Sequence, residues 1–290
     1  MKKVNVGIIG SGNIGTDLLI KILRSDILNC SIFIGRNLSS AGMKKANDLG
    51  VKISDKSIDA IIENPKICDI IFDATTASFH KQHAKVFKDL GIKAIDMTPS
   101  QVGKICVPAI NLKETLNADN INMITCGGQA SIPLAYTLKN LLPEIDYIET
   151  VSSISSRSAG PGTRANLDEY IHNTEKGLRD LAGCENVKAI LNLNPAIPCI
   201  DMQTTVFAKV DSCNNIEEVK SAIKDIENKI KKYVPGYNIV VPPIFENNRI
   251  MVMVRVQGLG DYLPSYAGNL DIINCAAITM AEEYAKQLQG

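Results

Sequence analysis

A glycine-rich turn close to the N-terminus constrains the fold of this 290-residue chain more than any other feature. The turn reads Gly10-Ser11-Gly12-Asn13-Ile14-Gly15 and lies between an apolar run at residues 4–9 and a helical pattern at residues 16–23. In a strand–GxGxxG–helix unit, the first glycine allows a tight turn, the second lets a pyrophosphate approach the backbone, and the third lets the helix pack closely on the strand. We therefore predict that residues 10–15 bind the phosphates of a dinucleotide.

Strand and helix patterns continue to alternate through the first 130 residues. Apolar runs typical of buried strands occur at residues 31–34, 67–72, 94–96 and 120–125, and helical patterns occur at 41–49 and 79–90. This alternation is typical of a doubly wound α/β fold, in which helices connect parallel strands. We predict a parallel Rossmann sheet in a dinucleotide-binding domain that covers residues 1–130.

Residues 131–269 show a different pattern. Alternating stretches rich in β-branched residues predict long strands at 147–156, 204–210 and 249–256, and helices are expected at 131–142, 167–181 and 216–233. The first of these helices would hold Pro133 in its first turn, where proline is tolerated. We predict a second α+β domain, with a largely antiparallel sheet, that carries catalysis and dimerisation. The last helix, residues 270–290, is expected to pack back on the first domain.

The charge balance of the chain excludes several classes of partner. Lys plus Arg and Asp plus Glu number 31 each, so the formal net charge is zero and nothing attracts the chain to nucleic acid or to an anionic membrane. No apolar run approaches the roughly 20 residues that a membrane-spanning helix needs. The first residues also lack the apolar core of a signal peptide. We therefore expect a cytoplasmic protein.

One of the eight cysteines is a candidate nucleophile. The cysteines are scattered without a CxxC pair, which argues against a metal site or a disulfide framework and predicts mostly buried, reduced thiols. Cys126 is the exception, because it ends a strand pattern and is followed by Gly127-Gly128 and a helical pattern. Ligands bind at the carboxyl ends of strands in such sheets, and a helix N-terminus favours a thiolate. We predict that Cys126 is the catalytic residue.

A cysteine nucleophile in a dinucleotide-binding protein suggests the oxidation of an aldehyde. The thiolate would add to the carbonyl carbon, and the adduct would pass a hydride to the nicotinamide and become a thioester. Water, phosphate or coenzyme A could then remove the acyl group. The residues considered so far do not indicate which of these three acyl acceptors is used.

The cofactor's ribose position lacks the expected carboxylate. A dinucleotide site usually has Asp or Glu after the second strand, but this chain has Gly35-Arg36-Asn37 there. Arg36, with Ser39 and Ser40 nearby, could instead hold a 2′-phosphate. NAD is the expected cofactor, with NADP as an open alternative.

A second candidate binding segment lies in the second domain. It reads Ser158-Ala159-Gly160-Pro161-Gly162-Thr163-Arg164-Ala165-Asn166, which is too rich in glycine and proline for an ordinary helix or strand. Its hydroxyls, arginine and amide are suited to ligand binding. We predict a cofactor-contacting loop at residues 158–166.

Four segments resemble the acylating acetaldehyde dehydrogenases of aromatic meta-cleavage pathways: residues 10–18, the segment Thr125-Cys126-Gly127-Gly128-Gln129-Ala130, and the segments SSISSRSAGPGTRAN (152–166) and YLPSYAGNLD (262–271). The resemblance covers nearly the whole chain and implies conversion of acetaldehyde, coenzyme A and NAD⁺ to acetyl-CoA and NADH. It also implies that Cys126 carries the acyl thioester, that Asn269 lies near the nicotinamide and that residues 158–166 contact the cofactor. A homodimer or higher oligomer and a 4-hydroxy-2-oxovalerate aldolase partner are expected.

The chain departs from the family pattern at two positions. The family often carries Asp where Arg36 stands, and it tends to carry Arg-Asp where this chain has Gln203-Thr204. Thr204 cannot replace a carboxylate as an acid or base. None of the histidines is a clear general base, since His80, His83 and His172 are expected at a helix start or on exposed helix surfaces.

Two other functions remain open on the sequence. One is a phosphorylating dehydrogenase of the semialdehyde type, which would use phosphate as the acyl acceptor. The other is a non-catalytic nucleotide-binding protein with Cys126 as a redox sensor. The long segment at 158–166 argues against a simple sensor.

Overall fold

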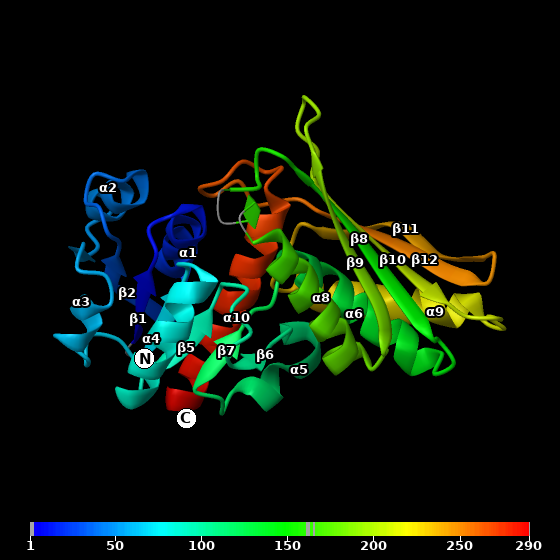
Figure 1. Ribbon diagram of the computed structural model, residues 1–290, viewed down its shortest axis with the longest axis horizontal. Helices are drawn as coiled ribbons and strands as arrows, with labels where there is room; N and C mark the ends of the chain where they lie inside the picture. Colours follow the sequence, from blue (N-terminus) through cyan, green and yellow to red (C-terminus); the bar gives the residue numbers. More distant parts are fainter. Residues whose placement is uncertain (1–2, 161–162, 165, 290) are drawn as a thin grey trace. The chain divides into compact units, whose positions relative to one another are not determined.

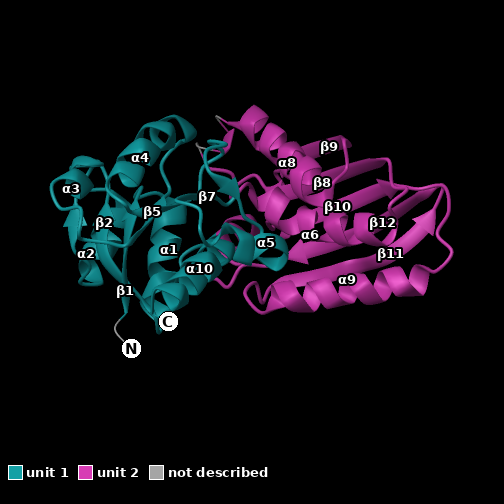
Figure 2. Ribbon diagram, turned by 90° about the horizontal axis from the view of Figure 1, so that it is seen from below, with its two compact units in different colours: residues 1–123, 261–263, 274–290 teal, residues 124–260, 264–273 magenta. Residues whose placement is uncertain are grey.

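The computed structural model describes residues 3–160, 163–164 and 166–289. The chain divides into two compact units (Figure 2), and each is described by itself. Unit 1 contains residues 1–123, 261–263 and 274–290, and unit 2 contains residues 124–260 and 264–273. The long helix α10 (Gly268–Gln289) therefore begins in unit 2 and ends in unit 1.

Unit 1 is built on a seven-stranded sheet in which all described pairs are parallel, with the strand order β3-β2-β1-β4-β5-β7-β6 (Figure 1). The strands are β1 (Val4–Ile9), β2 (Leu28–Ile34), β3 (Ile53–Ser54), β4 (Ile70–Asp73), β5 (Lys93–Asp96), β6 (Lys104–Ile105) and β7 (Asn120–Asn122). The helices are α1 (Asn13–Arg24), α2 (Ala41–Asp48), α3 (Asp59–Ile62), α4 (Ala77–Asp89) and α5 (Pro108–Thr115). The predicted doubly wound parallel sheet is confirmed.

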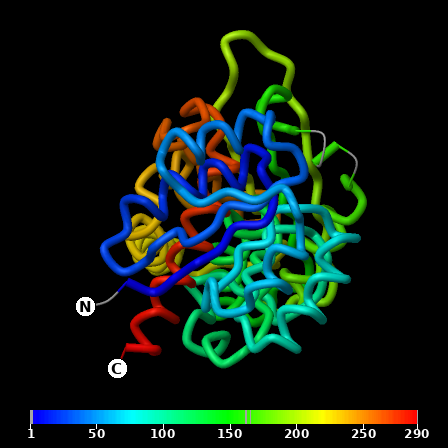
Figure 3. The backbone as a smooth tube through the Cα atoms, turned by 90° about the vertical axis from the view of Figure 1, so that its left-hand side faces the viewer, coloured from blue at the N-terminus to red at the C-terminus, as the bar shows by residue number. Residues whose placement is uncertain are grey.

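The central strands of unit 1 are buried because their side chains are almost all apolar. The second half of α10 belongs to the same unit and runs beside α1, as the red and dark blue tubes of Figure 3 show. Asn274 of α10 donates a hydrogen bond to the Asp17 carboxylate over 2.8 Å, and Ser25 donates one to Glu282 over 2.6 Å. These contacts fasten α10 to the N-terminal βα unit.

Unit 2 contains a five-stranded mixed sheet with the order β11-β12-β10-β8-β9, in which only the β8–β9 pair among the described strands is parallel. Its strands are β8 (Tyr147–Ser155), β9 (Asn186–Asn194), β10 (Met202–Lys209), β11 (Tyr237–Glu246) and β12 (Arg249–Val256). Its helices are α6 (Cys126–Leu141), α8 (Leu167–Ala182) and α9 (Ile216–Lys231), which lie along one face of the sheet (Figure 1). The predicted α+β character of this region is confirmed.

The structure differs from the sequence prediction at the start of α6. The helix begins at Cys126 rather than at residue 131, so Pro133 lies inside the helix and not in its first turn. The reason is a capping hydrogen bond, because the Thr125 hydroxyl accepts from the Gly128 amide over 2.9 Å and fixes both glycines in the first turn. In the part of the chain that the structure describes, no helix is long and apolar enough to cross a membrane.

Candidate active site

The glycine turn after β1 has the geometry that a bound pyrophosphate requires. Gly10 has a φ of +116°, and a Cβ added there would lie 2.4 Å from the Ala74 carbonyl oxygen. A Cβ on Gly15 would lie 1.9 Å from the Gly10 oxygen, so only glycine lets α1 pack this closely on the turn. A Cβ on Gly12 would meet nothing within 4 Å, so this backbone is open to a ligand. Gly12 caps α1 without a side-chain hydrogen bond, which leaves helix-start amides for an anion.

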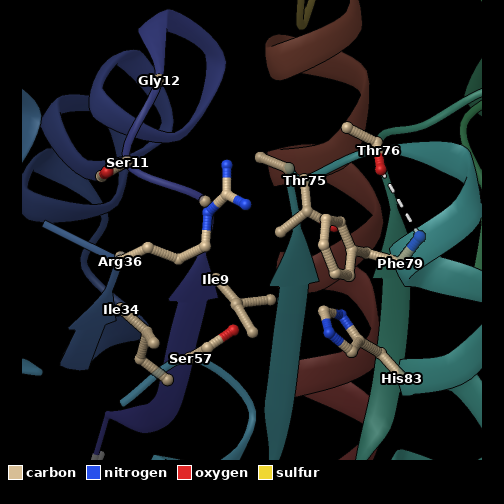
Figure 4. A pocket seen from close by; sticks show the side chains of 13 residues that line it. Ile9, Ser11, Gly12, Ile34, Arg36, Ser57, Thr75, Thr76, Phe79 and His83 are labelled. Atoms are coloured by element: carbon tan, nitrogen blue, oxygen red, sulfur yellow. Dashed lines mark hydrogen bonds between the residues drawn. The ribbon is translucent and has the colours of Figure 1, made fainter. Parts of the chain in front are cut away.

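A pocket of about 210 Å³ lies beside this turn in unit 1 (Figure 4). The turn contributes Gly10, Ser11 and Gly12, and the end of β2 contributes Ile34 and Arg36. The segment after β4 supplies the opposite wall, which is made by Ala74, Thr75, Thr76, Phe79 and His83. Because these walls come from the carboxyl ends of β1, β2 and β4, the pocket occupies the usual ligand position of an open α/β sheet.

Arg36 lines this pocket and contacts an aromatic ring in it. Its guanidinium carbon lies 5.5 Å from the centre of the Phe79 ring, a cation–π arrangement visible in Figure 4. Ser40, at the start of α2, hydrogen-bonds to the hydroxyl of Ser11 over 3.3 Å, whereas the Ser39 hydroxyl donates to Asn37. The guanidinium of Arg36 therefore reaches the wall that Phe79 forms, and no carboxylate is among the described residues that line the pocket.

The prediction that His83 is an exposed helix residue is wrong, whereas His80 lies near the start of α4, where a helix start was one of the two predicted places, but not at the surface. Both are buried, and each places Nδ1 within 2.9 Å of the same Asp73 oxygen. Burial lowers the pKa of His80, but the hydrogen bond to Asp73 and the charge of Asp96 outweigh burial and raise this pKa above its ordinary value. Asp73 ends β4, so the two histidines are drawn inward by a buried carboxylate that their local sequence does not reveal. His83 then lines the pocket beside the glycine turn.

Cys126 is the first residue of α6 and is partly exposed. The chain reaches it through Ile124, which has a φ of +58°, a strained conformation for a β-branched residue. Thr125 extends from this turn and caps the helix with its hydroxyl, which also hydrogen-bonds to the Thr174 hydroxyl over 2.7 Å. The turn thus presents the thiol at a helix N-terminus, as the position after a strand predicts.

Burial raises the pKa of the Cys126 thiol to about 11. Hydrogen bonds with Tyr170 and with the Gly127 amide lower this pKa, but by less than burial raises it. The thiol donates to the Tyr170 hydroxyl over 3.7 Å. Desolvation therefore outweighs the stabilisation that the helix N-terminus was expected to give, and the resting side chain is a thiol at neutral pH. The Gly128 amide donates to the Thr125 hydroxyl, so it is not available to an oxyanion.

The segment at 158–166 is only partly described, since Pro161, Gly162 and Ala165 lie outside the described residues. Arg164 holds its own loop, because its guanidinium donates to the Ala159 oxygen and to the backbone and hydroxyl oxygens of Ser156. Ser158 is buried and donates to Ser155, whereas a Cβ on Gly160 would meet nothing within 4 Å. Thr163 and Asn166 are partly buried. Arg164 is thus a structural residue of this loop.

Asn269 lies near the start of α10, in unit 2, and is 2 % exposed. Among the described residues, its side-chain oxygen is buried without a hydrogen-bond partner. An unpaired buried acceptor is costly, and a ligand donor such as a carboxamide N–H would satisfy it. Within unit 1, the open backbone at Gly12 separately fits a phosphate group.

Sequence reasoning missed Tyr170 and the pocket residues after β4. Tyr170 lies 44 residues from Cys126 in the chain, and a tyrosine in an amphipathic helix carries no local signal of a role at a thiol. Thr75 and Phe79 could have been found, because they follow a buried strand whose carboxyl end was expected at the ligand edge of the sheet.

Comparisons with known proteins agree with this geometry. Residues 5–118 match a family model described as the NAD-binding domain of semialdehyde dehydrogenase, and residues 126–264 match one described as the dimerisation region of prokaryotic acetaldehyde dehydrogenase. An acetaldehyde dehydrogenase of Pectobacterium atrosepticum is 58% identical over 283 residues, which cover 97% of this chain and 95% of that protein. One from Spirochaeta aurantia is 57% identical over 285 residues, which cover 98% of this chain and 96% of that protein.

A solved structure of aspartate semialdehyde dehydrogenase II from Vibrio cholerae, complexed with ASA, has a TM-score of 0.65 and covers 99% of both chains. Its sequence is 13% identical, so it supports the fold alone. The sequence matches go further, because relatives of this identity extend over nearly the full length of both chains. The chain belongs to the acetaldehyde dehydrogenase family.

Proposed function

We propose that this protein oxidises acetaldehyde, or another short aldehyde, to an acyl-CoA with NAD⁺ as the oxidant, through a thioester on Cys126. The observation that carries the proposal is the position of Cys126, a partly exposed residue at the start of α6, in a chain that also has the glycine turn at residues 10–15. The names of the relatives support acetaldehyde as the substrate, and the match to an NAD-binding domain supports NAD as the cofactor.

We assign each of these residues a separate role in the proposed reaction. Cys126 would form the bond to the carbonyl carbon, and the amide of Gly127 would stabilise negative charge at the sulfur. A bound nicotinamide would supply the hydride acceptor. Residues 10–15 would hold the pyrophosphate and Asn269 would accept from the carboxamide. The loop at 158–166 is a further proposed cofactor contact.

Arg36 supports use of NADP beside NAD. Arg36 lines the pocket, and Ser40 at the start of α2 hydrogen-bonds to Ser11, another lining residue. A 2′-phosphate would accept charge-assisted hydrogen bonds from Arg36 in exchange for its contact with Phe79.

Cofactor reduction tests the proposal directly. The purified enzyme is mixed with acetaldehyde and either NAD⁺ or NADP⁺, alone, with coenzyme A, or with phosphate. Reduction that requires coenzyme A supports the acylating reaction. Reduction that requires phosphate would favour a phosphorylating dehydrogenase, and cofactor binding without turnover would favour a redox sensor. The variant Cys126→Ser should bind cofactor and fail to reduce it.

The open face of the second sheet supports a homodimer. Val151, Ile190, Phe207, Met251 and Met253 share this face by register, opposite the face covered by the helices, and are partly exposed in the single chain. The match to a dimerisation model over residues 126–264 supports the same surface. Light scattering would test it, and co-purification with an added 4-hydroxy-2-oxovalerate aldolase would test the aldolase partner.

A further inference from the structure

A chain of buried hydroxyl groups begins at the Cys126 thiol and runs into unit 2. The thiol donates to the Tyr170 hydroxyl over 3.7 Å, and Tyr170 hydrogen-bonds in turn to the Ser152 hydroxyl. Ser152 pairs with Thr204 over 2.9 Å, since the two residues are register partners on β8 and β10 and face the helices. The three hydroxyl residues are at most 7 % exposed. The sulfur is therefore the outer end of a continuous hydrogen-bonded path.

A glycine in the first turn of α6 leaves space for the Tyr170 hydroxyl. A Cβ on Gly127 would lie 2.1 Å from the Tyr170 oxygen and 3.0 Å from the Ser152 oxygen. Only glycine at this position leaves room for the phenol beside the thiol. The capping residue Thr125 holds the same helix turn to Thr174, which lies one helical turn after Tyr170 on α8 and donates to its carbonyl oxygen. Tyr170 is thus held against Cys126 from two sides.

In the described part of unit 2, no other acid–base side chain hydrogen-bonds to the Cys126 sulfur. The histidine of this unit, His172, is exposed and directs Nδ1 to the Asp168 carbonyl. Thr204 stands where the resemblance implies a carboxylate, and a hydroxyl of threonine does not act as an acid or base near neutral pH. The phenol is the remaining titratable neighbour of the thiol.

We propose that Tyr170 is a catalytic residue that carries the Cys126 proton to the aldehyde oxygen while the sulfur adds to the carbonyl carbon. This inference rests on the proposed function. Ser152 is a positioning residue, because its hydrogen bond orients the phenol toward the thiol.

The proposed step balances without a further reactant. The Sγ–C bond forms while the S–H bond breaks, and the thiol proton passes to Tyr170 Oη. The Tyr170 O–H bond breaks at the same time, and its proton passes to the carbonyl oxygen, which takes up the π electron pair. The product is a neutral thiohemiacetal, and Tyr170 is again a neutral phenol. Hydride transfer follows as a separate step.

The protonation states agree with this route. Burial raises the pKa of Cys126 to about 11, and burial with the neighbouring Cys126 raises the pKa of Tyr170 well above its ordinary value. Both groups therefore hold their protons at neutral pH. A shuttle that moves two protons together creates neither a buried thiolate nor a buried phenolate.

The test compares Tyr170→Phe with Tyr237→Phe. Tyr237 is a matched control, since it is fully buried and donates its hydroxyl to the Ala130 carbonyl of the same helix, away from the thiol. Turnover with acetaldehyde, NAD⁺ and coenzyme A is measured for both. We expect Tyr170→Phe to lower kcat/KM by about 100-fold or more, as loss of acid–base catalysis does, and Tyr237→Phe to leave it unchanged.

A second readout follows alkylation of Cys126 by iodoacetamide against pH, with the modified peptide quantified by mass spectrometry. Loss of the hydrogen bond from Tyr170 to the developing thiolate should slow this alkylation about tenfold or more at mildly alkaline pH. The alkylation needs no aldehyde. It therefore judges the Tyr170–Cys126 pair even if the native enzyme does not oxidise acetaldehyde and the proposed function fails.

The inference is overturned if Tyr170→Phe keeps native turnover, if both tyrosine variants lose turnover alike, or if alkylation is unchanged. If Tyr170→Phe does not fold, Ser152→Ala takes its place. It should lower kcat/KM about tenfold by releasing the phenol, and unchanged turnover in this variant would count against the shuttle.

Discussion

Position 127, next to the candidate nucleophile, has no room for a Cβ because the Tyr170 hydroxyl lies there. The variant Gly127→Ala would test this packing. The added Cβ would lie 2.1 Å from Tyr170 Oη, 3.1 Å from Cζ of the same ring and 3.0 Å from Ser152 Oγ. The first distance is far inside van der Waals contact, so the phenol must move away. The other two require shifts of only a few tenths of an ångström.

The expected cost follows from two opposing effects. Alanine gains up to about 1 kcal/mol over glycine inside a helix, whereas overpacking a buried site costs about 1–3 kcal/mol. Because the phenol is held by Cys126 and Ser152, we expect the clash to win and Gly127→Ala to lower the free energy of unfolding by about 2 kcal/mol. In a Tyr170→Phe background the Oη contact is gone, and the same change should be close to neutral.

Urea denaturation of the native protein, both single variants and the double variant completes a double-mutant cycle, at one protein concentration because a dimer's stability depends on it. The expected coupling energy is about 2 kcal/mol in favour of the double variant. Effects that add to within about 0.5 kcal/mol would refute the packing argument and, with it, the position of the phenol against the helix.

Four further substitutions in unit 1 have expected outcomes. The Cβ of Gly12→Ala would meet open space, so this variant should keep the native unfolding midpoint but bind the cofactor more weakly in calorimetry. The Cβ of Gly15→Ala would lie 1.9 Å from the Gly10 oxygen, so this variant should destabilise the fold. Arg36→Ala should lower kcat/KM for NADP⁺ by roughly 10-fold or more relative to NAD⁺ if the guanidinium binds a 2′-phosphate. Burial raises the pKa of Asp73, but hydrogen bonds from the histidines outweigh burial and lower this pKa from 3.8 to about 2. Asp73→Asn should therefore lower the free energy of unfolding at neutral pH by about 2 kcal/mol. This stability is present above about pH 4 and is lost as the pH falls towards 2, so urea denaturation should show the two proteins converging in acid.

The elements with strong local patterns were predictable. The strands at 4–9 and 249–256 match β1 and β12 residue for residue, because their apolar and alternating side chains lie on sheets with buried faces. The strand β11 was missed because Pro242 and Pro243 lie within it, and prolines are normally a sign against a strand. β11 tolerates them as an edge strand with irregular pairing to β12. β9, the other edge, was also missed, although its apolar residues at 187, 189, 191 and 193 alternate with polar residues over most of its length.

The candidate site divides in the same way between local and long-range information. The glycine turn and Cys126 were predictable because strand, glycine and helix signals are contiguous there. The pairing of Tyr170 with Cys126, and of Ser152 with Thr204, depends on how α6, α8 and the second sheet pack, and no spacing in the sequence encodes it. The burial of His83 likewise depends on Asp73, a residue on a separate strand.

The high pKa of Cys126 and the absence of a carboxylate at Thr204 have a common physical basis. A helix N-terminus stabilises an anion by about 1 kcal/mol or less at ordinary sites, and burial around Cys126 exceeds this. A carboxylate at position 204 would lie on the buried face of β10 beside the Ser152 hydroxyl, where an unpaired charge is costly. Neutral hydroxyls avoid this cost, but they cannot prepare a thiolate in advance. A site of this kind must therefore move its proton as the carbon–sulfur bond forms, and the phenol that touches the sulfur is the group placed to move it.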